Sequence, residues 1–294
     1  MRRAPAPILA LVAVTAIWGY TFVPVQKAVG AYPLFAFLAV RFAISTLALA
    51  PFAWGPLRAL PRAGWAAGIV AGSFLALAYG LQTAGLELTT VTSTGFITGL
   101  YVVFTPLLAL AAFRTPVPAP VWIGVVFALA GLLLLSGAPG GSWTGNLLVL
   151  GNAVAQSFQI VAMERWAPRY DARALTILQM AVAFAGFAVV AVAAGQVEAP
   201  PDAATWYALV VTGVFAGALG YLVSTWVQSR TTAARAALVF TLEAPFAALF
   251  GVLLLSERLG WAGWTGCVVM LAGIVLAEPA AAVTLRRLVP ARAG

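Results

Sequence analysis

Ten apolar windows, each free of clustered charge, constrain this chain more than any other feature. The hydrocarbon core of a bilayer is about 30 Å thick and is crossed by about 20 helical residues. The windows lie at 8–25, 34–54, 65–86, 91–113, 117–136, 145–163, 174–194, 206–226, 236–255 and 261–277. The tails and connections that remain are too short to form a catalytic domain. The sequence therefore predicts an all-α integral membrane protein with ten transmembrane helices.

Composition excludes most other classes of protein. With 63% hydrophobic and 8% charged residues, the chain lacks the polar surface of a soluble globule. It has no histidine and a single cysteine, Cys267. An internal disulfide, a thiolate metal cluster and histidine-based catalytic or zinc sites are therefore excluded. We expect neither a cofactor nor a metal.

Lysine and arginine sort onto one side of this ten-helix map. Alternate connections and the two tails collect thirteen of the sixteen, namely Arg2, Arg3, Arg58, Arg62, Arg114, Arg165, Arg169, Arg173, Arg230, Arg235, Arg286, Arg287 and Arg292. The other side holds Lys27 and Arg258, and Arg41 lies inside the second window. Because cytoplasmic loops retain positive charge, both termini are expected in the cytoplasm. The same sorting explains the high pI without nucleic acid as a partner.

The chain contains a weak internal repeat. "VWIGVVFALAG" at 121–131 matches "GWTGCVVMLAG" at 263–273 with a displacement of 142, and Pro106 matches Pro245 with a displacement of 139. Residues 1–136 and 137–294 are therefore expected to be two five-helix repeats. Because five is odd, the second repeat starts on the opposite face, which gives inverted topology. Inverted repeats are typical of secondary transporters that bind substrate near the midplane.

Several stretches resemble the drug/metabolite transporter superfamily, and within it the ten-helix EamA-type exporters. They are "IWGYTFVPVQKA" at 17–28, "AVRFAIS" at 39–45, "EAPFAALFGVLLLSERL" at 243–259 and the Trp-x-Gly-x6-Gly ends of both halves. The overall pattern is most similar to that of the aromatic amino acid exporters. The resemblance implies a bacterial-type inner membrane location and a central cavity lined by the first, third, fourth, sixth, eighth and ninth helices. One departure is Thr115, which stands where the second half has the acidic Glu257.

Polar residues at helical spacing predict faces turned to protein or water. The fourth window carries Thr94, Thr98, Tyr101 and Thr105, and the sixth carries Asn152, Gln156 and Gln159. Interhelical hydrogen bonding is the alternative to a cavity, and for a single threonine it is the preferred one. The predicted substrate-binding residues are Trp18, Phe22, Tyr79, Gln82, Thr98, Tyr101, Asn152, Gln156, Gln159, Tyr221, Ser224 and Glu243.

The stretch from Trp18 to Ala28 contains aromatic, glycine and proline residues that a simple membrane anchor does not require. Trp18 and Phe22 lie four residues apart and can present aromatic surface to a cavity, while Gly19 permits close backbone approach and Pro24 removes a helical donor. An interfacial aromatic anchor is the alternative. Trp18 lies about ten residues, or roughly 15 Å, into the window, which favours the cavity.

Two charged residues fall inside the windows, Arg41 and Glu243. Each costs about 2.5 to 3.5 kcal/mol on insertion scales, so such residues indicate function. They could be structural partners, separate tethers for a substrate carboxylate and amine, or, for Glu243, a proton switch. The displacement of 139 pairs Glu243 with Phe104, so the acid breaks the pseudo-symmetry.

These features predict a secondary transporter that exports small amphiphilic metabolites by alternating access. Amino acids, aromatic ones included, suit a cavity with rings, amides and one charge of each sign; sugar phosphates would need more basic residues. Multidrug export, a membrane-embedded enzyme acting on lipid-linked substrates and a passive channel are the alternatives. The expected partners are the bilayer and a small-molecule substrate. Proton coupling is open, and a monomer suffices because the duplication already supplies both halves.

Overall fold

All regular secondary structure in the described part of the chain is helical. The structure, a computed structural model, describes residues 6–89, 91–136, 142–255 and 259–277. The first half contains α1 (Ala6–Val29), α2 (Leu34–Arg58), α3 (Arg62–Leu88), α4 (Val91–Gly99), α5 (Tyr101–Phe113) and α6 (Ala119–Ser136). The second contains α7 (Trp143–Trp166), α8 (Ala172–Ala193), α9 (Ala203–Val210), η1 (Val211–Gly220), α10 (Tyr221–Gln228), α11 (Ala233–Phe240), α12 (Glu243–Leu255) and α13 (Trp261–Ala277).

These elements form ten membrane-crossing segments within the described residues. Eight are long and apolar enough to span a bilayer, and Ala119–Leu135 and Trp261–Ala277 are two shorter apolar helices. The fourth span consists of α4 and α5, the eighth of α9, η1 and α10, and the ninth of α11 and α12. The ten predicted windows are therefore confirmed, with shifts of a few residues at their ends.

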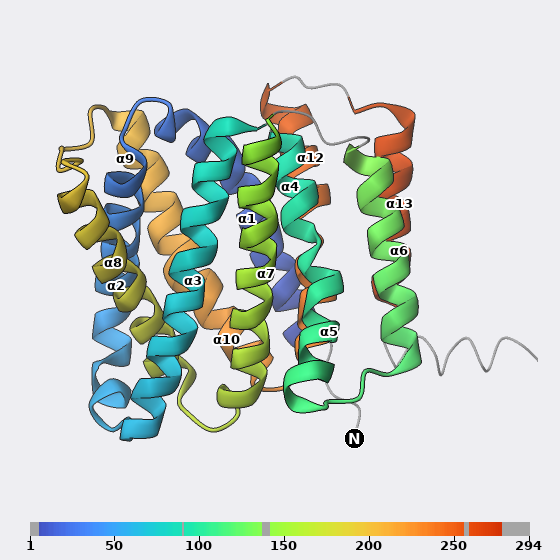
Figure 1. Cartoon of the computed structure of the whole chain (residues 1–294), viewed down its shortest axis with the longest axis horizontal. Helices are drawn as coiled ribbons and strands as arrows, with labels where there is room; N and C mark the ends of the chain where they lie inside the picture. Colours follow the sequence, from blue (N-terminus) through green and yellow to red (C-terminus); the bar gives the residue numbers. More distant parts are fainter. Residues whose placement is uncertain (1–5, 90, 137–141, 256–258, 278–294) are drawn as a thin grey trace, which may run out of the picture.

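The two halves run in opposite directions. In Figure 1, α1 rises from the lower edge of the bundle, whereas α7 descends from the upper edge. Contacts follow the same inversion: α2 packs on α8, α6 on α13, and the pairing of α3 with α7 is matched by that of α1 with the eighth span. Two inverted five-helix repeats are the arrangement expected for this pattern.

The fourth and ninth spans are interrupted near their middle. The fourth breaks at Leu100, and the ninth breaks at Thr241 and Leu242. Pro245 explains the second break, because it has no N–H to donate to the carbonyl of Thr241 four residues earlier. The corresponding proline, Pro106, lies inside the continuous helix α5, so the first break does not come from it. Pro24 likewise lies inside the continuous helix α1.

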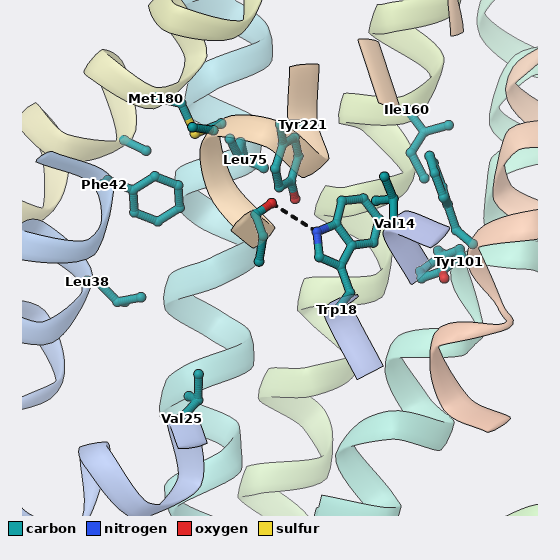
Figure 2. Packing of buried hydrophobic residues seen from close by; sticks show 14 of the residues in the cluster. Val14, Trp18, Val25, Leu38, Phe42, Leu75, Tyr101, Ile160, Met180 and Tyr221 are labelled. Atoms are coloured by element: carbon teal, nitrogen blue, oxygen red, sulfur yellow. Dashed lines mark hydrogen bonds between the residues drawn. The ribbon is translucent and has the colours of Figure 1, made fainter. Parts of the chain in front are cut away.

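The eighth span widens into a π-helical segment, η1. Two carbonyls of this segment accept hydrogen bonds from other helices: Trp18 Nε1 donates to Ala216 at 3.0 Å, and Ser45 Oγ donates to Gly213 at 2.8 Å. Figure 2 shows the Trp18 bond among the buried side chains that surround it. The first two helices are thus fixed to the eighth span through its backbone.

Basic residues gather at one edge of the bundle. Apart from Lys27 and Arg41, the described lysine and arginine residues lie at the lower ends of their helices in Figure 1 or in the adjoining connections. Lys27 closes α1 at the opposite edge. The predicted charge sorting is therefore reproduced for these residues, and the cytoplasmic placement of that edge stays a prediction. Glu257 and Arg258 lie outside the described residues.

Candidate functional site

A narrow cavity lies where the broken spans meet α1, α3, α7 and α10. Nine of the predicted site residues line it: Trp18, Tyr79, Gln82, Thr98, Tyr101, Asn152, Gln156, Tyr221 and Glu243. The volume of the cavity, counted as the space open to the centre of a water molecule, is about 30 Å³. Phe22 lines an adjoining hollow that shares Thr98, Tyr101 and Glu243 with the cavity. The six predicted helices therefore bring ten of the predicted residues to one place.

Aromatic rings form one wall of the cavity. The indole of Trp18 packs against Tyr221 and Phe240 with ring centroids 5.2 and 5.3 Å apart. Trp18 is 7% exposed, so it is a buried wall residue and not an interfacial anchor. Gly19 makes this position possible, because a Cβ there would lie 2.6 Å from Phe246 Cβ and 2.8 Å from the carbonyl oxygen of Glu243.

Arg41 lies behind two tyrosines. Its guanidinium carbon is 4.6 Å from the centroid of the Tyr79 ring, and its Nη2 donates to the Tyr79 hydroxyl at 3.4 Å. The Tyr221 hydroxyl donates to the same oxygen at 3.2 Å. Arg41 is 4% exposed and its Nε has no hydrogen-bond partner. A buried cation thus polarises a pair of hydroxyls that face the cavity.

Glu243 is the first residue of α12 and lines the cavity from the ninth span. Within the described residues, the ion pair formed at 4 Å or less is the one between Arg173 and Asp171. Arg41 and Glu243 are therefore not directly paired, although Arg41 acts on the Glu243 carboxylate through space. Arg41 contacts the Tyr79 ring and hydroxyl instead, and a structural partnership of the two charges stays a prediction.

Carboxamides and hydroxyls form a connected network on the opposite wall. Gln82 Nε2 donates to Thr98 Oγ1 at 3.2 Å, and Thr98 Oγ1 donates to Asn152 Oδ1 at 3.1 Å. Asn152 Nδ2 in turn donates to the carbonyl of Ala78 at 3.0 Å. The network joins α3, α4 and α7, so these residues both line the cavity and hold its wall together.

Two predicted site residues lie outside the cavity lining within the described chain. Gln159 is 1% exposed, and its Nε2 donates to Gln179 Oε1 of α8 at 2.8 Å. Ser224 is 2% exposed and accepts from Gln228 Nε2 at 2.9 Å. Each lies three residues after a lining residue of the same helix and is buried against protein. The Gln156 side chain donates to Gln159 at 3.3 Å and marks the boundary of the cavity.

Sequence reasoning missed Ile160 and Phe240, which also line the cavity. Both are apolar, so hydropathy alone does not separate them from core residues. A signal did exist in their spacing, since Ile160 lies four residues after Gln156 and Phe240 three before Glu243.

The end of the fourth span explains the departure at Thr115. Arg114 adopts the left-handed conformation with φ 51°, and the amide of Thr115 donates to the carbonyl of Ala109 at 3.3 Å. A backbone cap therefore closes this helix, so no acidic side chain is needed there.

Comparisons with known proteins agree with this architecture. The profile of the EamA-like transporter family matches residues 5–137 and again residues 143–277. The chain belongs to the EamA-like transporter family. An uncharacterized transporter of Archaeoglobus fulgidus is 30% identical over 273 residues, which cover 91% of this chain and 84% of the relative.

The fold of this EamA-like transporter also matches a solved structure. A protein known by its crystal structure aligns with a TM-score of 0.78 at 19% identity, covering 97% of this chain and 99% of the other. At that identity the likeness concerns the fold alone. This EamA-like chain is therefore a multi-pass membrane transporter, and the central cavity between its halves is the candidate site.

Proposed function

We propose that this transporter exports amino acids or similarly small zwitterionic metabolites across the inner membrane by alternating access. The observation that carries the proposal is the placement of opposite charges around one aromatic cavity. Glu243 lines it directly, and Arg41 backs it through Tyr79. A solute with an ammonium and a carboxylate group, and with an apolar side chain against Trp18, is complementary to that arrangement.

Tyr79 is the group proposed to receive the carboxylate. Its oxygen already accepts hydrogen bonds from Arg41 and from Tyr221. A phenol has one proton of its own and two acceptor positions. Its proton is therefore left to donate toward the cavity, and the nearby cation strengthens that donor. Glu243 is the corresponding acceptor for the ammonium group.

The width of the cavity supports a moving carrier. A space in which a water molecule has about 30 Å³ to move is too small for an amino acid. Substrate binding therefore requires the walls to separate. The interruptions at Leu100 and at Thr241 and Leu242 lie in spans that line the cavity, and a few residues outside regular helix are where hinges usually form.

Glu243 is also the proposed site of proton coupling. It is half-buried in a membrane span, lines the cavity and lacks an ion-pair partner within 4 Å in the described chain. Binding a proton would remove the cost of its charge when no ammonium group is present. Substrate and proton would then compete for one carboxylate, which is a simple basis for exchange.

Counterflow in proteoliposomes tests the proposal. Purified full-length protein is reconstituted with unlabelled amino acid inside, and uptake of a labelled panel is followed. We expect saturable counterflow for at least one amino acid. Leu147→Ala, on the exposed face of α7, should match the wild type. Chemical conversion of the solute, flux that does not saturate, or exchange of organic cations but of no amino acid would overturn the proposal.

A further inference from the structure

A second and larger hollow lies on the outside of the bundle. It is bounded by α1, α9 and the end of α12, and its lining includes Tyr20, Val23, Lys27, Asp202, Tyr207 and Leu254. The centre of a water molecule has about 390 Å³ here, against about 30 Å³ in the central cavity. We call this hollow the α1 groove.

The two faces of α1 separate the groove from the transport cavity. Trp18, Phe22 and Val25 recur at helical spacing and are all 8% exposed or less. Tyr20, Val23 and Lys27 recur with the same periodicity on another face and line the groove. Tyr207 and Leu254 across the groove are each 52% exposed. The groove therefore faces the surroundings of the bundle, which at this depth are lipid.

The floor of the groove is aromatic. The hydroxyls of Tyr20 and Tyr207 form a hydrogen bond of 2.6 Å that joins α1 to α9, and the Tyr20 ring contacts Phe250 of α12 edge to face with centroids 5.3 Å apart. This bond pairs one of the two hydroxyl protons within the floor, which lowers the cost of placing the two phenols against acyl chains. Val23 and Leu254 supply apolar walls.

Charge is confined to the rim. Lys27 and Asp202 are the charged residues among those that line the groove. Lys27 lies seven residues beyond Tyr20, which places it about 10 Å nearer the membrane surface. Asp202 accepts a hydrogen bond from the amide of Thr205 at 2.7 Å and so holds its carboxylate at the start of α9. Lys27 and Asp202 thus place one positive and one negative charge at the level of the lipid headgroups, next to the apolar part of the groove.

From this arrangement we infer that the α1 groove binds a phosphatidylethanolamine molecule of the leaflet in which α1 ends. The phosphate contacts Lys27, the ammonium group contacts Asp202, and one acyl chain lies along Val23 and Leu254 down to the tyrosine floor. A choline headgroup has no N–H to donate to Asp202, and a glycerol headgroup has no cation. Because α1 also carries Trp18, a lipid in this groove braces a wall of the transport cavity.

Native mass spectrometry of the detergent-purified full-length protein tests the inference. Phosphatidylethanolamine, phosphatidylcholine and phosphatidylglycerol are added separately and the retained lipid is counted. We expect phosphatidylethanolamine to be retained about fivefold better than either competitor. Lys27→Gln and Asp202→Asn should each remove most of that preference, and the asparagine keeps the helix cap.

Leu254→Trp and Leu253→Trp form a matched pair. Leu253 is 65% exposed beside the groove but does not line it. A tryptophan at 254 should fill the groove and lower phosphatidylethanolamine retention about fivefold, whereas one at 253 should leave it unchanged. The thermal stabilisation that the added lipid gives each variant provides a second readout. Equal retention of the three lipids, equal effects of the two tryptophans, or displacement of the lipid by an amino acid would overturn the inference.

Discussion

The fourth and the ninth span are both interrupted, and the residue that restarts each helix lines the cavity. That residue is Tyr101 in the fourth span and Glu243 in the ninth. The neighbouring contacts correspond as well. Gly19 of α1 meets the carbonyl of Glu243, and Ser157 Oγ of α7 lies 3.4 Å from the carbonyl of Tyr101. Duplication has therefore preserved the backbone arrangement, while the side chains at the two restart positions have diverged.

This correspondence corrects the pairing expected from the prolines. The displacement of 139 matched Glu243 with Phe104, but the helix restarts match it with Tyr101, a displacement of 142. That value is also the displacement of the Trp-Gly-Gly repeat in the fifth and tenth spans. The acid thus replaces a cavity-facing phenol, so the asymmetry lies within the candidate site.

The largest expected effect comes from closing the space at Gly19. In Gly19→Val, the Cβ would overlap Phe246 and the backbone at Glu243, which forces α1 away from α12. We expect the free energy of unfolding to fall by about 3 kcal/mol and transport to be lost. Ser157→Ala, at the corresponding position of α7 in the second half, removes a long hydrogen bond to Tyr101 and one of 2.8 Å to the carbonyl of Ala153 in the same helix, and should cost about 1 kcal/mol. Thermal unfolding of both purified proteins measures the difference. Equal stability would refute the close approach.

Substitution of the residue that restarts the helix should reduce transport more at Glu243 of the ninth span than at Tyr101 of the fourth. Glu243→Gln keeps the shape of the side chain but removes its charge, and we expect counterflow to fall about tenfold. Its flux should also stop responding to an imposed pH gradient. Tyr101→Phe removes one hydroxyl and should reduce counterflow about twofold. A Glu243→Gln protein that keeps the response of the wild type to pH would exclude this residue as the proton switch.

Truncating the cavity wall of the first half and of α7 should give intermediate effects. Tyr101→Ala removes a ring and Gln156→Ala removes an amide, and both residues line the cavity. We expect each to lower transport about fivefold at normal membrane abundance. Transport rates normalised to protein in the membrane check this. If both variants transport like the wild type, these polar residues serve only to pack helices.

The smallest effect is expected at a carboxylate that starts a helix outside the membrane. Asp171 accepts from the amide of Arg173 at 2.8 Å, and hydrogen bonding from the Arg173 side chain lowers the pKa of Asp171 from its ordinary value of 3.8. The stabilisation is therefore present above that value and is lost as the pH falls through the folded pKa. We expect Asp171→Ala to cost about 0.5 to 1 kcal/mol at pH 7 with unchanged transport.

Thermal unfolding at pH 7 and pH 3 tests this expectation, and the gap between Asp171→Ala and the wild type should narrow at the lower pH. If Asp171→Ala lost as much transport as Glu243→Gln, the expectation would be contradicted, and an acidic residue at the start of a helix would be required for transport outside the cavity as well.

Most of the fold followed from hydropathy, charge sorting and the repeat, because a bilayer imposes helix length and pairs every backbone group locally. The breaks did not. Leu100 is an unremarkable residue beside Gly99, and the π-helical segment depends on carbonyl partners such as Trp18 and Ser45, which are distant in sequence. The spacing of polar residues predicted the cavity. It could not show that Gln156 lines the cavity and Gln159 does not, because Gln159 bonds a residue of another helix, Gln179 of α8.

Accessibility of position 156 from the two sides of the membrane distinguishes a cavity that opens alternately to each side from a packed interface between helices. On a Cys267→Ser background, Gln156→Cys is treated with a charged thiol reagent in right-side-out and inside-out vesicles. Phe158→Cys, at the same depth but 37% exposed on the outside of α7, is the control. We expect Gln156→Cys to react from both sides, more slowly with a transported amino acid, and Phe158→Cys to react from neither. Failure of Gln156→Cys to react from either side, or its reaction from one side only, would contradict a cavity with alternating access.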